Sequence, residues 1–255
     1  MSLEDGIPGM PSGWKVRHVA QTGSTNADLL ADAEAGREGH RSVLLTDHQV
    51  AGRGRLDRRW EAPPGTNLLV SLLFTDVEGA PGRLSQEVGV AAVEAVERLA
   101  DRRGVAPPQR GTLGLKWPND VLLGDRKLAG ILAQRSVATG AVVVGIGLNV
   151  GWAPDGAASL AGDLGLDVRP VELLAELLDS FDLDVLAEPT PPHVAARYRD
   201  RLLTLGQAVR VELPADEQLF GTAVDVDGAG RLVVDDDRGV RHVLDVGDVV
   251  HLRPV

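Results

Sequence analysis

The 255-residue chain contains no cysteine, which excludes disulfide bonds and metal sites built from thiolates. It also has no uninterrupted apolar run near the ~20 residues that a membrane-spanning helix needs. Its N-terminus lacks the basic start and the apolar stretch of a secretory signal peptide. These absences fit a reducing compartment, so we expect a cytoplasmic protein with no membrane partner.

Basic residues are in the minority, because 26 lysines and arginines face 37 aspartates and glutamates, for a net charge of −11. A chain this acidic is a poor general binder of nucleic acid, and we expect no nucleic-acid partner. Hydrophobic residues make up 44% and charged residues 25%, an ordinary globular composition that argues against disorder as the main state. The chain is long enough to bury a proper core as one large domain, or as one domain plus a small one.

Apolar residues in the first two hundred positions follow the strand period in some segments and the helix period in others. The predicted strands are 14–18, 42–49, 67–74, 113–120, 120–134 and 141–150, with GDRK (124–127) as a tight turn between the last two. The predicted helices run from Ser24 or Thr25 to about Gly36, from Leu84 to Ala100, from Pro170 to Phe181, and from His193 to Leu205, ending at Gly206. Because the strands are grouped and do not strictly alternate with helices, the pattern predicts an α+β fold and not a doubly wound sheet.

The texture of the sequence changes after Gly206. Short β-rich runs alternate there with turn signals such as DGAG and DDRG, which is typical of a small barrel. We therefore predict a flexible N-terminal segment at 1–13, a main domain at 14–205 and a C-terminal β domain at 206–255.

One short stretch, AGRGRLDRRWEAPPGTN at 51–67, gathers Arg53, Arg55, Arg58 and Arg59 within seven positions. A guanidinium is a planar fork of donors that pairs with carboxylate or phosphate, and Gly52 and Gly54 would let the backbone approach an anion. The spacing matches neither the phosphate-binding P-loop nor the dinucleotide fingerprint. Taken alone, the loop fits an anion site and a solvated turn paired with the chain's own acids equally well. A single-stranded nucleic-acid site, with Trp60 stacking on a base, is the third reading.

Other polar residues stand at predicted strand ends. Lys116, Asn119 and Asp120 belong to KWPND, Lys127 precedes an apolar strand, and Asn149 ends another. Each also has a structural explanation: a hairpin turn for the Asn and Asp side chains, a solvent-facing lysine, and a turn asparagine. The hydroxyls of TGSTN (22–26) likewise fit a helix cap.

Taken together, these segments resemble the biotin protein ligase family, which includes the biotin–[acetyl-CoA-carboxylase] ligases and holocarboxylase synthetases. The matching pieces, in the family's order and spacing, are GSTN (23–26), Gln49 with GRGR (52–55), Arg58 with Trp60, KWPNDV (116–121), KLAGIL (127–132) and GIGLNV (145–150). The resemblance covers the chain from about Trp14 to Val255. It implies a class II synthetase-like catalytic domain, in which a mixed β-sheet is flanked by helices, followed by a small SH3-like β-barrel. Two departures stand out: Asp57 replaces a frequent glycine, and only about a dozen residues precede Trp14, which indicates the monofunctional class without an N-terminal DNA-binding domain.

The resemblance also implies an activity. The family joins biotin to ATP to give biotinyl-5′-AMP and pyrophosphate, with Mg²⁺ as cofactor, and then passes the biotinyl group to one lysine of an apo biotin carboxyl carrier domain of a carboxylase. The implied catalytic residues are Lys127, Arg53 and Asp120. The implied biotin-binding residues are Ser24, Thr25, Asn26, Gln49, Gly52, Arg53, Gly54, Arg55, Lys127 and Gly130, and the implied ATP-binding residues are Arg53, Arg55, Arg58, Trp60, Asn119, Lys127 and Asn149. No residue is assigned as a direct metal ligand.

Two alternatives stay open at this point. A lipoate–protein ligase performs the same chemistry on a different acid, and a biotin-sensing protein would bind the ligand without catalysis. We also expect the arginine loop to be mobile without ligand, because four unpaired guanidinium groups repel one another, and to become ordered when the adenylate forms.

Overall fold

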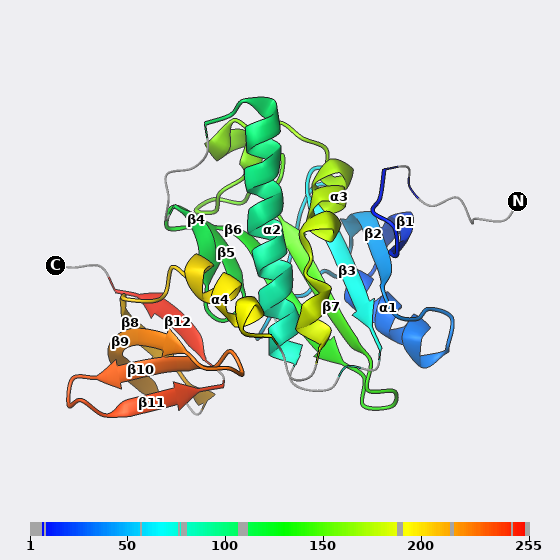
Figure 1. Cartoon of the computed structure of the whole chain (residues 1–255). Coiled ribbons are helices and arrows are strands. Elements are labelled where there is room, and N and C mark those ends of the chain that lie inside the picture. The colour runs from blue at the N-terminus through cyan, green and yellow to red at the C-terminus, as the bar shows by residue number, and fades with distance from the viewer. Residues whose placement is uncertain are drawn as a thin grey trace, which may run out of the picture.

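The computed structural model describes residues 7, 9–56, 58–75, 77, 81–106, 112–187, 191–214, 217–245 and 247–252. Asp57 and most of the N-terminal segment predicted to be flexible lie outside these ranges. Within them, no helix has the length and apolar character needed to cross a membrane. The described residues form two β-sheets with helices packed on both faces of the larger one (Figure 1).

The larger sheet has seven strands in the order β1-β2-β3-β7-β6-β5-β4. β1 and β2 are parallel and all the other neighbours are antiparallel, so the sheet is mixed as predicted. The strand bounds are β1 Lys15–Thr22, β2 Ser42–Gln49, β3 Leu68–Phe74, β4 Leu113–Lys116, β5 Asp120–Leu123, β6 Arg126–Arg135 and β7 Val142–Leu148.

Helices cover the two faces of this sheet unequally. α1 (Thr25–Glu34) packs alone on one face, where Leu29 contacts Leu44, Leu73 and Val143. The main core lies on the other face, under α2 (Pro81–Arg103), α3 (Pro170–Ser180) and α4 (Pro192–Arg201). Because β3 is covered on both sides, all seven of its residues are buried, which explains its continuous apolar run. The ten-residue α1 is too short to cover the whole of the sheet face on which it packs.

The predicted segments are largely present, with three corrections. The strand predicted at 113–120 ends at Lys116, because a turn over residues 117–119 separates β4 from β5. GDRK does form a turn, but this turn lies inside the stretch predicted as one strand (120–134) and divides it into β5 and β6. Gly124 has a φ of +63° there, a backbone conformation that glycine adopts without strain. The last helix ends at Arg201, not at Gly206, because Leu203 N–H donates to the carbonyl of Leu115 and ties the following residues to β4.

The C-terminal residues form a separate antiparallel sheet in the order β11-β10-β9-β8-β12. Its strands are β8 Ala208–Glu212, β9 Gln218–Val226, β10 Leu232–Asp236, β11 Arg241–Leu244 and β12 Asp248–His251. The α+β class with a β-rich C-terminal unit is confirmed. Within the described residues, the ladder runs from β11 to β12 and no pairing joins these two end strands.

The C-terminal sheet is attached to the larger one through its β9–β10 turn. The indole N–H of Trp117 and the side-chain amide of Gln86 each donate to the carbonyl of Gly230, at 3.1 Å. Arg199 in α4 pairs with Asp225 in β9 at 2.7 Å. Figure 1 shows the sheet beside β4, β5 and α4. The end of β12 therefore lies near the strands that carry KWPND.

Arg197 in α4 links three carboxylates behind the sheet. Its Nη1 donates to both oxygens of the buried Glu87 (2.9 and 3.0 Å) and to Asp182 (3.2 Å), and its Nη2 donates to Glu94 (3.0 Å). One guanidinium therefore serves several acids. Burial of Glu87, only partly offset by Arg197 and by the Asp182 N–H, raises the pKa of that carboxyl from 4.5 to about 7.

We expect Glu87 to make the free energy of unfolding fall with pH. Because its pKa is raised in the folded state, its contribution is complete below about pH 4.5 and is lost as the pH rises through about 7. At about 1.4 kcal/mol per pKa unit, the full change is of the order of 3 kcal/mol. Chemical denaturation of the parent chain and of the Glu87→Gln variant from pH 4.5 to 8 measures this difference. The exposed Glu212→Gln variant is the control, and parallel profiles for the parent and Glu87→Gln would contradict the assignment.

Candidate active site

A pocket of about 250 Å³ opens on the sheet face that α1 only partly covers. Along β7, Val143, Gly145 and Gly147 point to this face in succession, because alternate residues of a strand share a side. Val143 packs under α1, whereas the two glycines lie beyond the helix N-terminus and form the floor of the pocket with Gly130 of β6. The pocket exists because α1 does not extend over this part of the sheet, and because Gly145 and Gly147 of β7 place no side chains there.

The pocket brings together every residue predicted for the site except Gly52. These lining residues are Ser24, Thr25, Asn26, Gln49, Arg53, Gly54, Arg55, Arg58, Trp60, Asn119, Asp120, Lys127, Gly130 and Asn149. The individual roles assigned to them stay predictions. Gly52 serves the loop itself, because a Cβ there would lie 2.3 Å from the carbonyl oxygen of Trp60.

One corner of the pocket, called the polar corner below, is formed by Ser24, Thr25 and Asn26 at the start of α1 together with Gln49. Gln49 Oε1 accepts from the backbone N–H of Thr25 at 2.8 Å and lies 3.2 Å from its hydroxyl. Asn26 Nδ2 donates to Leu132 O (3.0 Å) and to Gln134 Oε1 (2.9 Å), and Asn26 Oδ1 accepts from Ser71 at 2.6 Å. These bonds hold the corner rigid, and they already engage much of the capacity of Thr25 and Asn26.

Two other groups at this corner are available to a ligand. The buried Ser24 precedes the first residue of α1, but its hydroxyl makes no capping bond to the helix. Gln49 uses its oxygen on Thr25, and among the described residues no hydrogen bond engages its Nε2. A hydroxyl and an amide N–H group can therefore bind a polar ring that offers both an acceptor and a donor.

The arginine loop forms a small hairpin of its own. Gly54 N–H donates to Arg58 O at 2.7 Å, Trp60 N–H donates to Gly52 O at 3.1 Å, and Arg53 and Arg59 form an antiparallel bridge. Leu56, at the tip, has a φ of +54°. These bonds define the backbone of the hairpin over its described residues.

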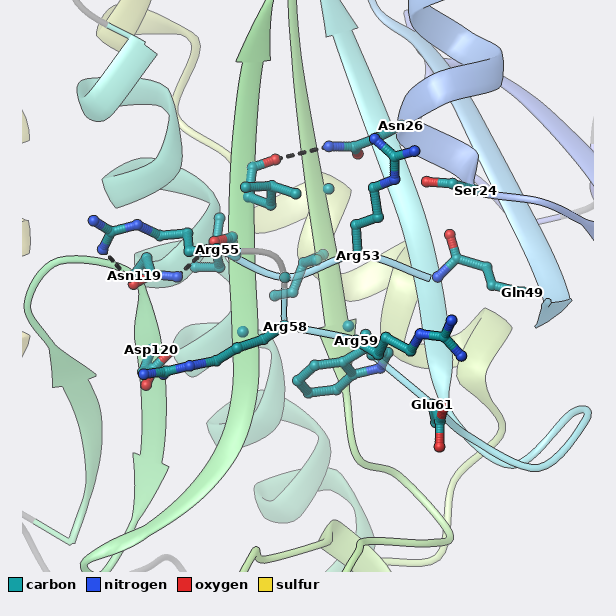
Figure 2. A pocket seen from close by; sticks show the side chains of 18 of the residues that line it. Ser24, Asn26, Gln49, Arg53, Arg55, Arg58, Arg59, Glu61, Asn119 and Asp120 are labelled. Atoms are coloured by element: carbon teal, nitrogen blue, oxygen red, sulfur yellow. Dashed lines mark hydrogen bonds between the residues drawn. The ribbon is translucent and has the colours of Figure 1, made fainter. Parts of the chain in front are cut away.

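The hairpin sends its four arginines in two directions (Figure 2). Arg55 extends to Asn119 Oδ1 (3.0 Å) and to Gly247 O (3.4 Å), and Arg58 pairs with Asp248 at 2.8 Å. Arg53 extends the other way, toward Ser24 and Asn26, and Arg59 also lies on that side (Figure 2). Within the described ranges, neither Arg53 nor Arg59 has a hydrogen-bond or ion-pair partner. The expectation of four unpaired guanidinium groups is therefore wrong for two of them, because Asn119 and the C-terminal sheet supply partners.

Lys127 lines the pocket between an acid and an aromatic ring. Its Nζ is 2.7 Å from Asp120 Oδ1 and 5.8 Å from the centroid of the Trp60 ring. A Cβ at Gly130 would lie 3.1 Å from both Lys127 Nζ and Trp60 Cζ3, so the glycine makes room for both side chains. Because the Lys127 side chain is 39% exposed and lines the pocket, an anion can reach it from there.

Two of the predicted asparagines are held by the protein. Asn119 donates to Ile131 O at 2.8 Å and accepts from Arg55, so it aims that arginine. The buried Asn149 donates to Ala158 O at 3.0 Å and accepts from Asn67 at 3.2 Å. Asn149 therefore lines the pocket with both ends of its amide already bonded.

The pocket is also lined by residues that the sequence alone did not assign to the site. They are Leu56, Arg59, Glu61, Val70, Ile131, Leu132, Gly145, Ile146, Gly147, Pro154 and Asp248. The alternation of glycine in GIG within an otherwise apolar strand was a readable signal for a bare sheet face. Nothing in the sequence indicates that Asp248, 190 residues from Arg58, joins the same site.

Comparison with known protein families agrees with this geometry. Residues 20–151 match the Biotin/lipoate A/B protein ligase family, and residues 204–252 match the Biotin protein ligase C terminal domain. The chain is 44% identical to a biotin–[acetyl-CoA-carboxylase] ligase of Mycobacterium tuberculosis, over 99% of this chain and 95% of that protein. It is 38% identical to the ligase of the same name from Paracoccus denitrificans, over 64% and 70% of the two chains.

Solved structures share the fold. The biotin protein ligase from Aquifex aeolicus in complex with biotin and ATP superimposes with a TM-score of 0.76, at 24% identity, over 94% of this chain and 99% of that one. The Leishmania major enzyme with biotinyl-5-AMP gives a TM-score of 0.63, at 24% identity, over 91% and 99%. The motifs, the pocket and these likenesses agree, and the chain belongs to the biotin/lipoate A/B protein ligase family.

Proposed function

We propose that this protein is a biotin protein ligase that activates biotin with ATP and transfers it to a lysine of an apo biotin carboxyl carrier domain. The observation that carries the proposal is one pocket lined by a polar corner, by Lys127 and by two guanidinium groups that have no partner among the described residues. The named relatives are biotin–[acetyl-CoA-carboxylase] ligases, and the solved neighbours hold biotin with ATP or biotinyl-5-AMP.

The first half-reaction must bring two anions together, because the biotin carboxylate attacks the α-phosphate of ATP and pyrophosphate leaves. Arg53, which has no side-chain partner in the part of the chain that the structure describes, would bind the carboxylate beside the polar corner. Arg55 and Arg58 would hold the phosphates on the other side of the hairpin. Lys127, between the two groups, would neutralise the junction where the new bond forms. Trp60 would close over the ligands with its apolar face.

The second half-reaction needs a base for the incoming lysine, and we assign this role to Asp120, which lines the pocket beside Lys127. In the structure Asp120 is paired with Lys127. When Lys127 turns to the adenylate, the carboxylate is released. The amine nitrogen then attacks the acyl carbon, its proton passes to Asp120, and the bond between the carbonyl carbon and the phosphate oxygen breaks as AMP departs. The same ion pair thus links activation to transfer.

Mg²⁺ belongs to this proposal as a partner of the nucleotide. The carboxylates nearest the phosphate side, Asp120 and Asp248, are each engaged by a cation of the chain. Mg²⁺ commonly keeps its waters and is held largely by substrate phosphates, so this donor set fits an ion delivered with ATP. When bound, the ion would offset phosphate charge. Its direct protein ligands are not assigned.

The division of labour along the chain is also part of the proposal. Residues 14–205 would form the catalytic biotin- and ATP-binding domain, and residues 206–255 the C-terminal domain. We place the reaction in the cytoplasm, where ATP and carboxylases are available, and we expect neither nucleic acid nor a membrane to take part.

One assay tests the proposal. Purified protein is incubated with labelled ATP, Mg²⁺, either biotin or lipoate, and an apo carrier domain. We expect pyrophosphate release and a labelled carrier with biotin only. Transfer of lipoate in preference to biotin would identify a lipoate–protein ligase, and biotin binding without pyrophosphate would identify a sensor.

Arg55→Ala should impair the use of ATP more than the binding of biotin. This arginine extends toward Asn119 and Gly247, away from the polar corner. Loss of one charge-assisted contact, about 1.5–3 kcal/mol, corresponds to a roughly 10- to 150-fold rise in KM for ATP. Steady-state kinetics with each substrate varied measures it, with the distant Arg98→Ala variant as control. Equal losses for both substrates would show that the two sides of the hairpin do not divide the ligands.

A further inference from the structure

The C-terminal sheet reaches the arginine loop through two consecutive residues. Gly247 supplies a carbonyl oxygen to Arg55 at 3.4 Å, and Asp248 supplies a carboxylate to Arg58 at 2.8 Å. Asp248 is also part of the pocket lining. These are the two arginines that the hairpin directs away from Arg53 and Arg59 (Figure 2). Gly247, just before β12, and Asp248, its first residue, therefore hold both guanidinium groups on one side of the site.

The local backbone places this pair of contacts. A Cβ at Gly247 would lie 2.6 Å from Val211 Cγ1 and 3.3 Å from Glu212 O, so only glycine lets β12 begin this close to β8. Asp248 pairs with Glu212 across the ladder, which fixes its backbone. Its side chain, 26% exposed, is thus presented from a rigid element.

The contact with Arg58 leaves most of that guanidinium free. One nitrogen, Nη2, bonds one oxygen of Asp248, and among the described residues the group makes no second bond. A guanidinium has five N–H donors in a fixed fork, so the remaining donors can take a phosphate while the pair with Asp248 persists. Arg55 is similarly held by single bonds to Asn119 and to Gly247. This arrangement orients the arginines without saturating them.

We propose that Asp248 is a positioning residue for the nucleotide, which holds Arg58 toward the phosphates and so makes the C-terminal sheet part of the ATP-binding half of the site. This inference rests on the proposed ligase function. Asp248, fixed on β12, already restricts the exposed Arg58 side chain. That side chain therefore loses fewer orientations when ATP binds. Biotin, at the other side of the hairpin, is not affected.

The test compares Asp248→Ala, Asp248→Asn and Asp248→Glu with the parent. We expect Asp248→Ala to raise KM for ATP about five-fold, the upper range for an exposed ion pair, with KM for biotin unchanged. Asp248→Glu, which keeps a carboxylate, should have a KM for ATP close to that of the parent. Asp248→Asn should have a KM between those of the parent and Asp248→Ala. Asp245→Ala removes the same charge from the same sheet outside the pocket lining and should leave both constants unchanged.

A second measurement needs no catalysis. Amide hydrogen exchange of residues 52–60 in the ligand-free protein should be faster in Asp248→Ala than in Asp245→Ala, because one anchor of the hairpin is lost. An unchanged KM for ATP would overturn the inference, and a lower one would show that Asp248 competes with ATP. Either result in an active enzyme leaves the ligase function intact, whereas a parent that releases no pyrophosphate refutes that function and the inference together.

Discussion

Replacing Lys127 by alanine is expected to lower adenylate formation roughly 100- to 1,000-fold, the usual loss when a group that stabilises developing charge is removed. The ammonium lies between Asp120 and the Trp60 ring and faces the pocket. Without it, the carboxylate and the α-phosphate meet with less neutralisation, and Asp120 adds its own unpaired negative charge to the junction. Pyrophosphate release under saturating biotin and ATP measures the effect.

The neighbouring Arg126 supplies a matched control for Lys127. It lies on the same strand, but its side chain pairs with Asp163 at 2.5 Å and is not part of the pocket lining. Arg126→Ala should keep near-parental pyrophosphate release, and Lys127→Arg, which keeps the charge, should fall between the two alanine variants. Near-normal release by Lys127→Ala would refute its role at the junction.

Gly147→Ala should weaken the binding of biotin, because the methyl group added to β7 would displace the Trp60 ring. The added Cβ would lie 2.4 Å from Trp60 Cε2 and 2.5 Å from its Nε1. Overpacking of this kind costs about 1–3 kcal/mol, which corresponds to a roughly 5- to 150-fold loss of affinity. We expect the loss in biotin binding measured by calorimetry, together with a changed tryptophan fluorescence spectrum.

The thermal unfolding midpoint separates a local effect at Gly147 from damage to the fold. Trp60 belongs to the hairpin and not to the main core, so it can move aside with little change in the midpoint. Gly82→Ala, where no atom lies within 4 Å of the added Cβ, is the control for adding a methyl group. Unaltered biotin affinity in Gly147→Ala would show that the position of Trp60 on the glycine floor does not matter to the ligand.

The site was largely predictable because its residues occur in short motifs that carry their own geometry. KWPND ends one short strand and begins the next, and Lys127 begins β6, so the turns alone present these side chains at one edge. The GRGR segment could be interpreted as an anion-binding loop from guanidinium chemistry and glycine content. The resemblance to the family then indicated which anions to expect there.

What could not be predicted depends on contacts between distant segments. The partners of Arg55 and Arg58 come from residues 247–248, and no local pattern reports a pairing over 190 positions. The early end of α4 is set by Leu115, whose carbonyl takes up the N–H of Leu203. In each case tertiary pairing outweighed the local period.

The polar corner also has a thermodynamic consequence. Its bonds join the start of α1, the end of β2, the middle of β3 and β6, so the corner exists only when these four elements are assembled. An unfolded or half-assembled chain has nothing equivalent to offer a ligand. Any molecule bound there selects the native state, and a concentration 100 times its Kd would add about 2.7 kcal/mol to the free energy of unfolding. The vitamin would thus protect the enzyme that consumes it.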